Sequence, residues 1–526
     1  MTGRFDLAVI GAGFGGSLMA MIAHQLGLSV VLLEQGRHPR VTIGESTTPL
    51  SNLLLERLSL RYDLPRIAPL AKWGSWQRSY PEISCGLKRG FSFFHEDGQL
   101  LVAASPHDDI ADTHWYRADV DHFLVNEAQR LGVEYHDDSR IESLDFAEDG
   151  ATIVGWRGDE WFRFQAGFVI DATGPRGFLH RALRLEESPL PGMPPTESLY
   201  GHFTEVGRSD VGGDTPPYPV DDAAVHHVFE GGWVWVLRFN NGVTSAGVAA
   251  TQVVARELAL SQGAAAWQRV LERLPVLKAQ FRRAVACQPF RHMPVLSFRS
   301  RTIVGRRWAM LPSAAGFVDP LLSTGFALTL MGIERLARIL QTGDFAGGLQ
   351  GYAQQTDSEL LAASRLISTL YATMGNFPAF TAVSLLYFAA VSFSESALRL
   401  EKPELARGFL LDEHPGFGPM ARLLLERSYK LNGDLETLAF TEEVLRLIGP
   451  FNLGGFGDPA RRNWYPVRGE DLMNSGYKLG ASREEIRAML DRTGFWGQLG
   501  RTADPSTPLR SGRDDKGRVV TPSGIA

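Results

Sequence analysis

The sequence predicts an α/β fold built around a Rossmann-like unit that binds a dinucleotide. Three observations lead to this prediction: an apolar strand at residues 7–10, a glycine-rich turn directly after it, and a second apolar strand that ends in an acid at Glu34. The chain has 526 residues, of which 44% are hydrophobic and 21% charged. A chain of this length can bury a large core and normally divides into more than one region.

The glycine turn has the pattern GxGxxG at Gly11, Gly13 and Gly16, and a helical stretch follows it as far as Gly27. Gly11 permits the tight turn, Gly13 lets the backbone approach a pyrophosphate, and Gly16 allows close packing of the helix. Glu34 comes 18 residues after Gly16, where a carboxylate can hold the hydroxyl pair of a ribose. The alternative is a glycine turn without a ligand, which this order of strand, turn, helix and acid disfavours.

Composition excludes several classes of function. The net charge is −6 without a Lys/Arg run, so nucleic acid is not an expected partner. The 2 cysteines, Cys85 and Cys287, lack metal-ligand spacing, so neither a disulfide framework nor a metal site is expected and a cytoplasmic location fits. No signal peptide is recognisable, and the longest apolar run, residues 380–393, is shorter than the roughly 20 residues of a membrane span. We expect a buried helix there.

Further elements extend the dinucleotide-binding pattern. Arg117 precedes a helix with one apolar face that ends at Gly132, and an apolar strand ends at Asp171. These segments resemble the FAD-binding domain of flavoprotein monooxygenases, a Rossmann-like fold of the glutathione-reductase type assembled from separated pieces of chain. The resemblance implies FAD as the cofactor. It also implies that the residues that bind FAD are Gly11, Gly13, Gly16, Glu34, Ser46, Arg117 and Asp319. No second well-placed GxGxxG occurs, which favours electron delivery by a separate protein.

Four motifs narrow the resemblance. Residues 44–49 read GESTTP, residues 86–93 contain Lys88, residues 231–238 contain Trp233 and Trp235, and residues 314–325 end in Ser-Thr-Gly. In this order they are similar to the motifs of flavin-dependent halogenases of the tryptophan-halogenase type. Lys88 stands in the position of that family's catalytic lysine.

The resemblance also implies a reaction. FADH2, O2 and chloride or bromide would give hypohalous acid, which travels to Lys88 and there either accepts a hydrogen bond from the ammonium or forms a haloamine. A small electron-rich aromatic then takes the halogen. Ser323, Thr324 and Gly325 would hold the halide, and a helix N-terminus has the donors and partial positive charge for it. The implied partner is a separate NAD(P)H-dependent flavin reductase.

Simpler interpretations remain open at this stage. Lys88 could be a surface lysine beside Arg89, Ser323 could merely cap a helix, and the two tryptophans could belong to an ordinary half-buried strand. An FAD-dependent aromatic monooxygenase without halogenation is the second candidate function. A degenerate flavoprotein that serves as a binding module is the third.

Three departures from the family pattern bear on these alternatives. Arg238 replaces a proline of the tryptophan motif, and Pro312-Ser313 replaces Gly-Asp, which removes a carboxylate expected near the ribityl chain. Leu322 replaces a glutamate typical of halogenases that act on free tryptophan. We therefore expect a phenol- or pyrrole-like substrate.

The chain is expected to divide into three parts. Residues 1–345 form the FAD-binding domain, with an interleaved substrate-side β-sheet at about residues 181–290. Residues 346–505 form a helical C-terminal region that covers the substrate pocket. The polar residues 506–526 form a disordered tail.

Overall fold

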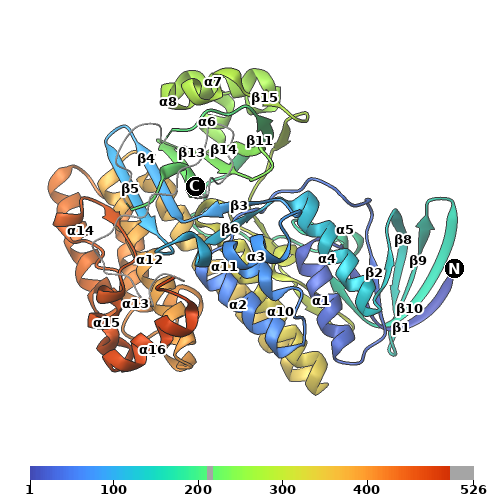
Figure 1. Ribbon diagram of the computed structural model, residues 1–526. Helices are drawn as coiled ribbons and strands as arrows, with labels where there is room; N and C mark the ends of the chain where they lie inside the picture. Colours follow the sequence, from blue (N-terminus) through green and yellow to red (C-terminus); the bar gives the residue numbers. More distant parts are fainter. Residues whose placement is uncertain (210–216, 498–526) are drawn as a thin grey trace, which may run out of the picture.

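The computed structural model describes residues 1–209 and 217–497. Three regions are visible in Figure 1: a sheet with helices at the N-terminal side, a second sheet capped by short helices, and a group of C-terminal helices. The tail predicted at residues 506–526 lies outside the described residues.

The first sheet is the predicted Rossmann-like core, and it confirms the fold class. Its described strands follow the order β18-β19-β10-β1-β2-β7, and β1 is parallel to both β2 and β10. Helix α1 (Phe14–Gln25) packs against helix α4 (Arg117–Leu131), which ends at the left-handed Gly132 as predicted. The strands are β1 (Thr2–Ile10), β2 (Val30–Leu33), β7 (Glu134–His136), β10 (Glu160–Asp171), β18 (Val304–Gly305) and β19 (Trp308–Met310), and β8 (Ser139–Phe146) and β9 (Ala151–Arg157) extend it beside β10.

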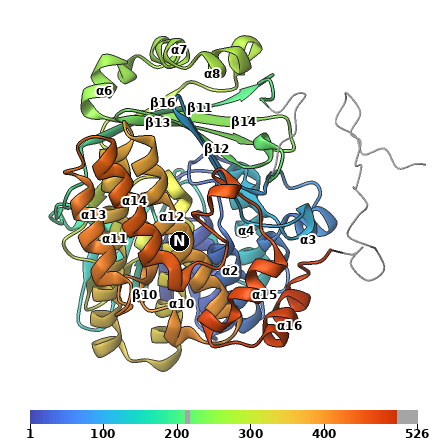
Figure 2. The same ribbon diagram turned by 90° about the vertical axis from the view of Figure 1, so that its left-hand side faces the viewer.

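The second sheet is assembled from distant parts of the chain and extends beyond residues 181–290. Its described strands follow the order β15-β11-β14-β13-β12-β4-β5-β21, with β16 beside β11. Their bounds are β4 (Gly90–His95), β5 (Gly98–Ala103), β11 (Thr196–Thr204), β12 (Ala224–Phe229), β13 (Gly232–Arg238), β14 (Thr244–Thr251), β15 (Val285–Ala286), β16 (Arg291–Met293) and β21 (Trp464–Tyr465). Helices α6 (Gln252–Glu257), α7 (Ala264–Arg273) and α8 (Pro275–Gln280) cover its outer face in Figure 2.

Strand β13 is buried on both faces, so the alternative interpretation as an ordinary half-buried strand does not hold. Val234 and Val236 pack with Trp267 of α7 on the outer side. Trp233 and Trp235 point the other way and belong to the main core. The tryptophans therefore lie on the inner face of the sheet.

The C-terminal region is mostly helical, as expected, although it also contributes strand β21. Its helices are α11 (Phe345–Thr373), α12 (Phe377–Arg399), α13 (Gly418–Ser428), α14 (Asp434–Ile448), α15 (Gly469–Ser475) and α16 (Arg483–Thr493). At 23 residues, α12 is longer than the apolar run in the sequence, and among the described helices it alone has the length and composition of a membrane span. Because 83% of its most apolar 18-residue stretch is buried within the protein, α12 is the buried helix that the sequence predicts.

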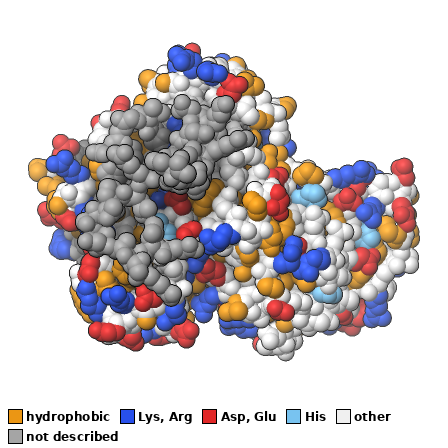
Figure 3. Space-filling model, viewed as in Figure 1, with side chains coloured by type: hydrophobic (Ala, Val, Ile, Leu, Met, Phe, Trp, Pro, Cys, Tyr) orange, Lys and Arg blue, Asp and Glu red, His pale blue; other side chains and the backbone are white. Residues whose placement is uncertain are grey.

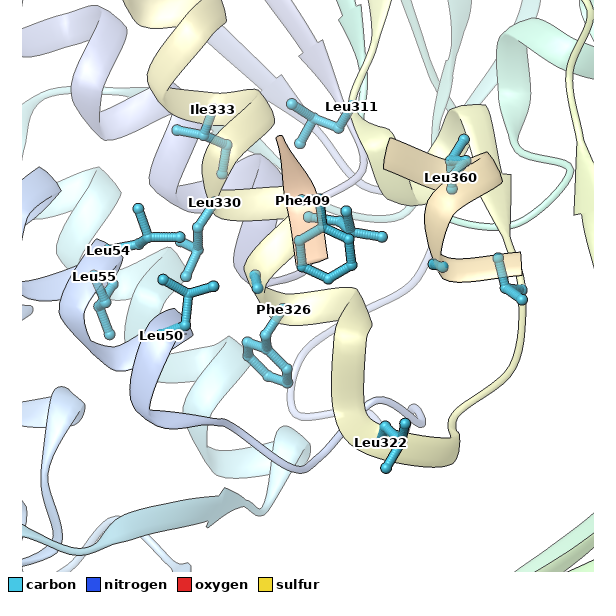
Figure 4. Packing of buried hydrophobic residues seen from close by; sticks show 14 of the residues in the cluster. Leu50, Leu54, Leu55, Leu311, Leu322, Phe326, Leu330, Ile333, Leu360 and Phe409 are labelled. Atoms are coloured by element: carbon cyan, nitrogen blue, oxygen red, sulfur yellow. The ribbon is translucent and has the colours of Figure 1, made fainter. Parts of the chain in front are cut away.

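Helices α2 (Pro49–Arg61) and α10 (Thr324–Thr342) connect these regions through a shared core. Figure 4 shows Leu50 and Leu54 of α2 beside Leu330 and Ile333 of α10. This packing holds the first half of α10 against α2, and the halide site is predicted at the N-terminus of α10.

The segment around Lys88 is divided between two strands. The chain bends at Arg89, so that residues 86–93 belong partly to β3 (Cys85–Lys88) and partly to β4. The Arg89 amide donates to the Asp222 carbonyl at 2.6 Å, and its carbonyl accepts from the Ala104 amide at 2.7 Å. Strand β3 pairs instead with β6 (Asp112–Trp115), so that Lys88 lies directly opposite Asp112.

Surface charge agrees with the small net charge of the chain. On the described part of the face in Figure 3, Lys and Arg side chains lie among Asp and Glu side chains. Such a mixed surface is not typical of a polyanion-binding protein.

Candidate functional site

A cavity of about 1300 Å³ lies at the carboxyl edge of the first sheet and continues to the inner face of the second. Ligands of open α/β sheets bind at this edge. The predicted residues in its wall are Gly11, Gly13, Glu34, Ser46, Arg117, Asp319, Ser323, Thr324 and Gly325. Gly16 and Lys88 are not part of the wall.

Two of the three glycines of the turn, Gly11 and Gly16, are required by the protein's own geometry. Gly11 has φ +99°, and a Cβ there would stand 2.8 Å from the backbone of Ala172. A Cβ on Gly16 would stand 1.8 Å from the Gly11 carbonyl oxygen. At Gly13, however, the nearest atom to a Cβ would be Nη2 of Arg117 at 3.4 Å, so the protein itself leaves room there. The space beside Gly13 opens to the cavity and suits a pyrophosphate.

Glu34 is held at the end of β2 by several donors. Its Oε2 accepts from the Ala12 amide at 2.9 Å and from Arg40 at 3.1 Å, and its Oε1 accepts from the Gly36 amide at 2.9 Å. Burial acts to raise the pKa of this carboxyl, but Arg40 and the amide donors outweigh it and lower the pKa. Glu34 is therefore a fixed carboxylate at the edge of the cavity.

Arg117 fixes the loop that precedes α2. Its Nε and Nη2 each donate to Asp121 at 2.8 Å, and its Nη1 donates to the carbonyls of Ile43 and Gly44 at 3.1 and 2.9 Å. The bidentate pair orients the guanidinium. This loop brings Ser46 to the cavity, and the Ser46 hydroxyl is buried without a hydrogen-bond partner among the described residues.

Asp319 joins the cavity to the helical region through a chain of hydrogen bonds. Its Oδ1 accepts from the Leu321 amide at 2.9 Å, and its Oδ2 accepts from the Tyr371 hydroxyl at 2.9 Å. Trp233 Nε1 donates to the same hydroxyl at 3.2 Å. Burial raises the pKa of Asp319 to about 7.

The turn before α10 has an unusual backbone. Leu322 and Ser323 both adopt left-handed conformations, with φ of 65° and 55°, and Leu322 is fully buried. The Tyr387 hydroxyl supports the turn by donating to the Leu322 carbonyl at 2.8 Å. Ser323 makes no side-chain cap, so the capping interpretation is wrong. The turn brings the first amides of a 19-residue helix to the cavity wall.

Lys88 is fully buried, so it is not a surface lysine. Its ammonium donates to the Thr47 carbonyl at 2.5 Å and lies 3.9 Å from the centre of the Phe91 ring. Burial lowers the pKa of Lys88, and the nearby Asp112 carboxylate opposes this shift. A lysine in this environment can exchange a proton or act as an amine near neutral pH.

A second cavity, of about 170 Å³, adjoins the Lys88 segment on the side of the C-terminal helices. Thr48, Phe91 and Asp112 line it together with residues of α12 and the segment before β21. Ser46 lines the large cavity and Thr48 the small one, and Lys88 binds the carbonyl of the residue between them. Lys88 thus lies between the two cavities.

Sequence reasoning missed several buried polar residues of this site. His202 Nε2 lies 2.7 Å from Glu45 Oε1, and both side chains are buried at the wall between the sheets. Asp112 and Tyr371 also lie outside every motif. Asp112 lies in a mixed polar segment that also contains Asp108 and Asp109, and nothing in the sequence distinguishes it or Tyr371.

Two of the departures from the family pattern have a structural account. Arg238 lies on the outer side of β13, where it forms an ion pair with Asp221 at 2.9 Å and donates to the Val206 and Gly207 carbonyls. It is turned away from Trp233 and Trp235. Ser313 lies in the wall of the large cavity without replacing the missing carboxylate.

The large cavity fits FAD. The turn at Gly13 leaves room for a pyrophosphate, Glu34 is a fixed acceptor for ribose hydroxyls, and the Ser46 hydroxyl lacks a partner among the residues that the structure describes. All three features line the same cavity at the carboxyl edge of the sheet, where a dinucleotide binds in this type of fold.

The chain is similar to known halogenases. Residues 112–376 match the family model described as tryptophan halogenase. The chain is 30% identical to monodechloroaminopyrrolnitrin halogenase PrnC of Pseudomonas fluorescens over 71% of this chain and 69% of that one. It is also 30% identical to tetracycline 7-halogenase of Kitasatospora aureofaciens over 73% of each chain. The crystal structure of a mutant of the halogenase PltM in complex with FAD shares the fold, with a TM-score of 0.78, 23% identity, and coverage of 88% of this chain and 100% of that one.

Proposed function

Because this chain belongs to the tryptophan halogenase family, whose members are FAD-dependent oxidoreductases, we propose that it halogenates a small electron-rich aromatic compound with FADH2, O2 and chloride or bromide. The proposed substrate is phenol- or pyrrole-like. A separate NAD(P)H-dependent flavin reductase in the cytoplasm delivers the reduced flavin.

The large cavity holds the cofactor in this proposal. Glu34 accepts hydrogen bonds from the adenosine ribose, and the backbone at Gly13 approaches the pyrophosphate. Once bound, the reduced flavin would supply two electrons and two protons, with which O2, halide and one further proton give hypohalous acid and water. The chain's own residues then have to bind the halide and control where the hypohalous acid goes.

The halide site is proposed at the start of α10. The amides of Thr324 and Gly325 are the first of the helix and have no intrahelical acceptor, and the helix dipole adds partial positive charge. Apart from the two chain neighbours and the backbone of the same helix, no described atom lies within 4 Å of the position that a Gly325 Cβ would occupy, which leaves space for an anion.

Lys88 is the proposed site of halogen transfer. Its ammonium can donate a hydrogen bond to hypohalous acid, or its amine can displace hydroxide to form a haloamine. From hydrogen-bonded hypohalous acid, the halogen passes to an aromatic carbon and the ring proton leaves with the hydroxide as water. From the haloamine, whose formation has already released water, the halogen passes to the ring and the ring proton returns to the Lys88 nitrogen. The low pKa of Lys88 makes both protonation states accessible.

The small cavity is the proposed substrate pocket. An apolar cavity of about 150 Å³ binds benzene, so 170 Å³ accommodates one substituted ring. Leu322 supports a substrate other than free tryptophan, because it leaves an apolar side chain where tryptophan-specific relatives have a glutamate. The two relatives are named for monodechloroaminopyrrolnitrin and tetracycline.

The burial of Lys88 between two cavities is the observation that carries this proposal. Enzyme, FAD, a flavin reductase, NADH, O2 and bromide or chloride are mixed with phenols and pyrroles, and products are identified by mass spectrometry. We expect halogenated products from wild type. Lys88→Ala keeps flavin oxidation and loses halogenation. Retained halogenation by Lys88→Ala would contradict the role of Lys88, and hydroxylated products throughout the panel would favour a monooxygenase.

A further inference from the structure

Asp112 is a buried carboxylate in the wall of the small cavity. Its side chain is 4% exposed, and its Oδ1 accepts a hydrogen bond from Asn52 Nδ2 at 2.7 Å. Its Oδ2 has no hydrogen-bond partner among the described residues. Although Lys88 lies opposite on the neighbouring strand, the two side chains form no ion pair within 4.0 Å in this part of the chain. One carboxylate oxygen of a residue that lines the small cavity is therefore an unpaired acceptor.

None of the described donors around the small cavity donates to Asp112 Oδ2. Lys88 donates to the Thr47 carbonyl and Tyr387 to the Leu322 carbonyl. Arg399 is held by Glu395 at 2.7 Å. A buried carboxylate oxygen without a donor is unfavourable, so this position favours a molecule that brings its own O–H or N–H.

We propose that Asp112 Oδ2 accepts a hydrogen bond from the hydroxyl or amine group of the substrate and thereby orients the ring toward Lys88. This inference rests on the proposed halogenase function and deepens it, since it restricts the substrate to hydroxyarenes, aminoarenes or N–H heteroarenes. The bond fixes one edge of the ring at β6 while the opposing strand presents the lysine. An analogue whose donor is methylated would leave Oδ2 unpaired and is rejected.

The test uses resorcinol and 1,3-dimethoxybenzene, which have similarly activated rings but differ in the donor. For each enzyme, kcat/KM for resorcinol is divided by kcat/KM for 1,3-dimethoxybenzene, both measured with bromide. This ratio is then divided by the ratio of the rates at which free hypobromous acid brominates the same two arenes. Wild type should prefer resorcinol by roughly 10- to 100-fold beyond the free reagent. In Asp112→Asn, the new amide keeps its oxygen toward Asn52 and presents an N–H donor to the cavity, so this preference should disappear or reverse.

A matched control separates recognition from general destabilisation. Glu127 of α4 is another buried carboxylate, it pairs with Arg66 and Arg130, and it lies outside both cavities. Glu127→Gln should keep the wild-type preference, even if its melting temperature falls. Asp112→Leu, which removes both polar oxygens, should lose the preference without reversing it.

The possible failures are distinguishable. Production of hypobromous acid is scored in the same reactions with a small-molecule halogen trap. If wild type forms hypobromous acid but brominates neither arene, or if Asp112→Asn keeps the full preference, the role of Asp112 is refuted. If wild type forms no hypobromous acid with reduced flavin and O2, the proposed function itself fails.

Discussion

Replacement of Gly13 by alanine should separate flavin binding from folding. The added Cβ would have as its nearest neighbours Nη2 of Arg117 at 3.4 Å and Nη2 of Arg40 at 3.8 Å, which are ordinary contacts. The backbone of Gly13, with φ −74° and ψ −177°, is one that alanine adopts readily. The free energy of unfolding should therefore change by less than about 1 kcal/mol.

The effect on FAD should be much larger. The methyl group of Gly13→Ala projects into the space through which a pyrophosphate approaches the start of α1. Loss of one hydrogen bond to a charged group costs about 1.5–3 kcal/mol, so the Kd for FAD should rise by roughly 10- to 150-fold. Fluorescence titration of the apoprotein with FAD measures the Kd, and urea denaturation measures the free energy of unfolding.

Two further variants calibrate this experiment. Gly16→Ala brings a Cβ within 1.8 Å of the Gly11 carbonyl oxygen and should destabilise the fold itself by about 1–3 kcal/mol. Gly351→Ala, on an exposed turn of α11 with no described atom within 4 Å, should leave the Kd unchanged and stabilise the helix by up to about 1 kcal/mol. Wild-type FAD affinity in Gly13→Ala would refute the assignment of the turn to the pyrophosphate.

Three other predictions follow from the site. Glu34→Gln should raise the Kd for FAD by roughly 10-fold and leave that for FMN, which lacks the adenosine ribose, unchanged; equal losses for both flavins would contradict the ribose contact. Burial raises the pKa of Asp319 above its unfolded value, so the folded protein binds more protons between about pH 4 and pH 7 and its stability falls across that interval as pH rises. Asp319→Asn should flatten this slope in urea denaturation, and an unchanged slope would exclude Asp319 as its source. Cys287 is exposed and Cys85 buried with a raised pKa, so a thiol reagent should label one cysteine in the native protein and both after unfolding; rapid labelling of both would contradict the burial of Cys85.

The local sequence pattern was sufficient to predict the arrangement of the dinucleotide-binding half of the site. Gly11, Gly13 and Gly16 lie within six positions, and Glu34 ends the next strand, so their geometry follows from one strand-turn-helix-strand unit. The end of α4 at Gly132 was predictable for the same reason. The roles of these residues toward FAD remain predictions.

The surroundings of Lys88 were not predictable because they depend on pairing between distant segments. Asp112 comes opposite Lys88 only through the register of β3 and β6. Tyr371 reaches Asp319 because α11 packs against the loop before α10, across 52 positions of sequence. The bend at Arg89 likewise depends on Asp222, and no periodicity within residues 86–93 indicates it.

The strand order of the second sheet has a consequence for biosynthesis. Strand β4 pairs with β12 from more than a hundred positions later, and β21, at residues 464–465, pairs with β5 at the sheet edge. During translation, the outer edges of β4 and β5 stay unpaired until β12 and β21 have left the ribosome. Such high contact order slows folding and exposes strand edges to aggregation. Expression in a recombinant host should therefore benefit from slower synthesis and chaperone capacity, and a fragment ending at residue 345 should be recovered mainly as insoluble protein.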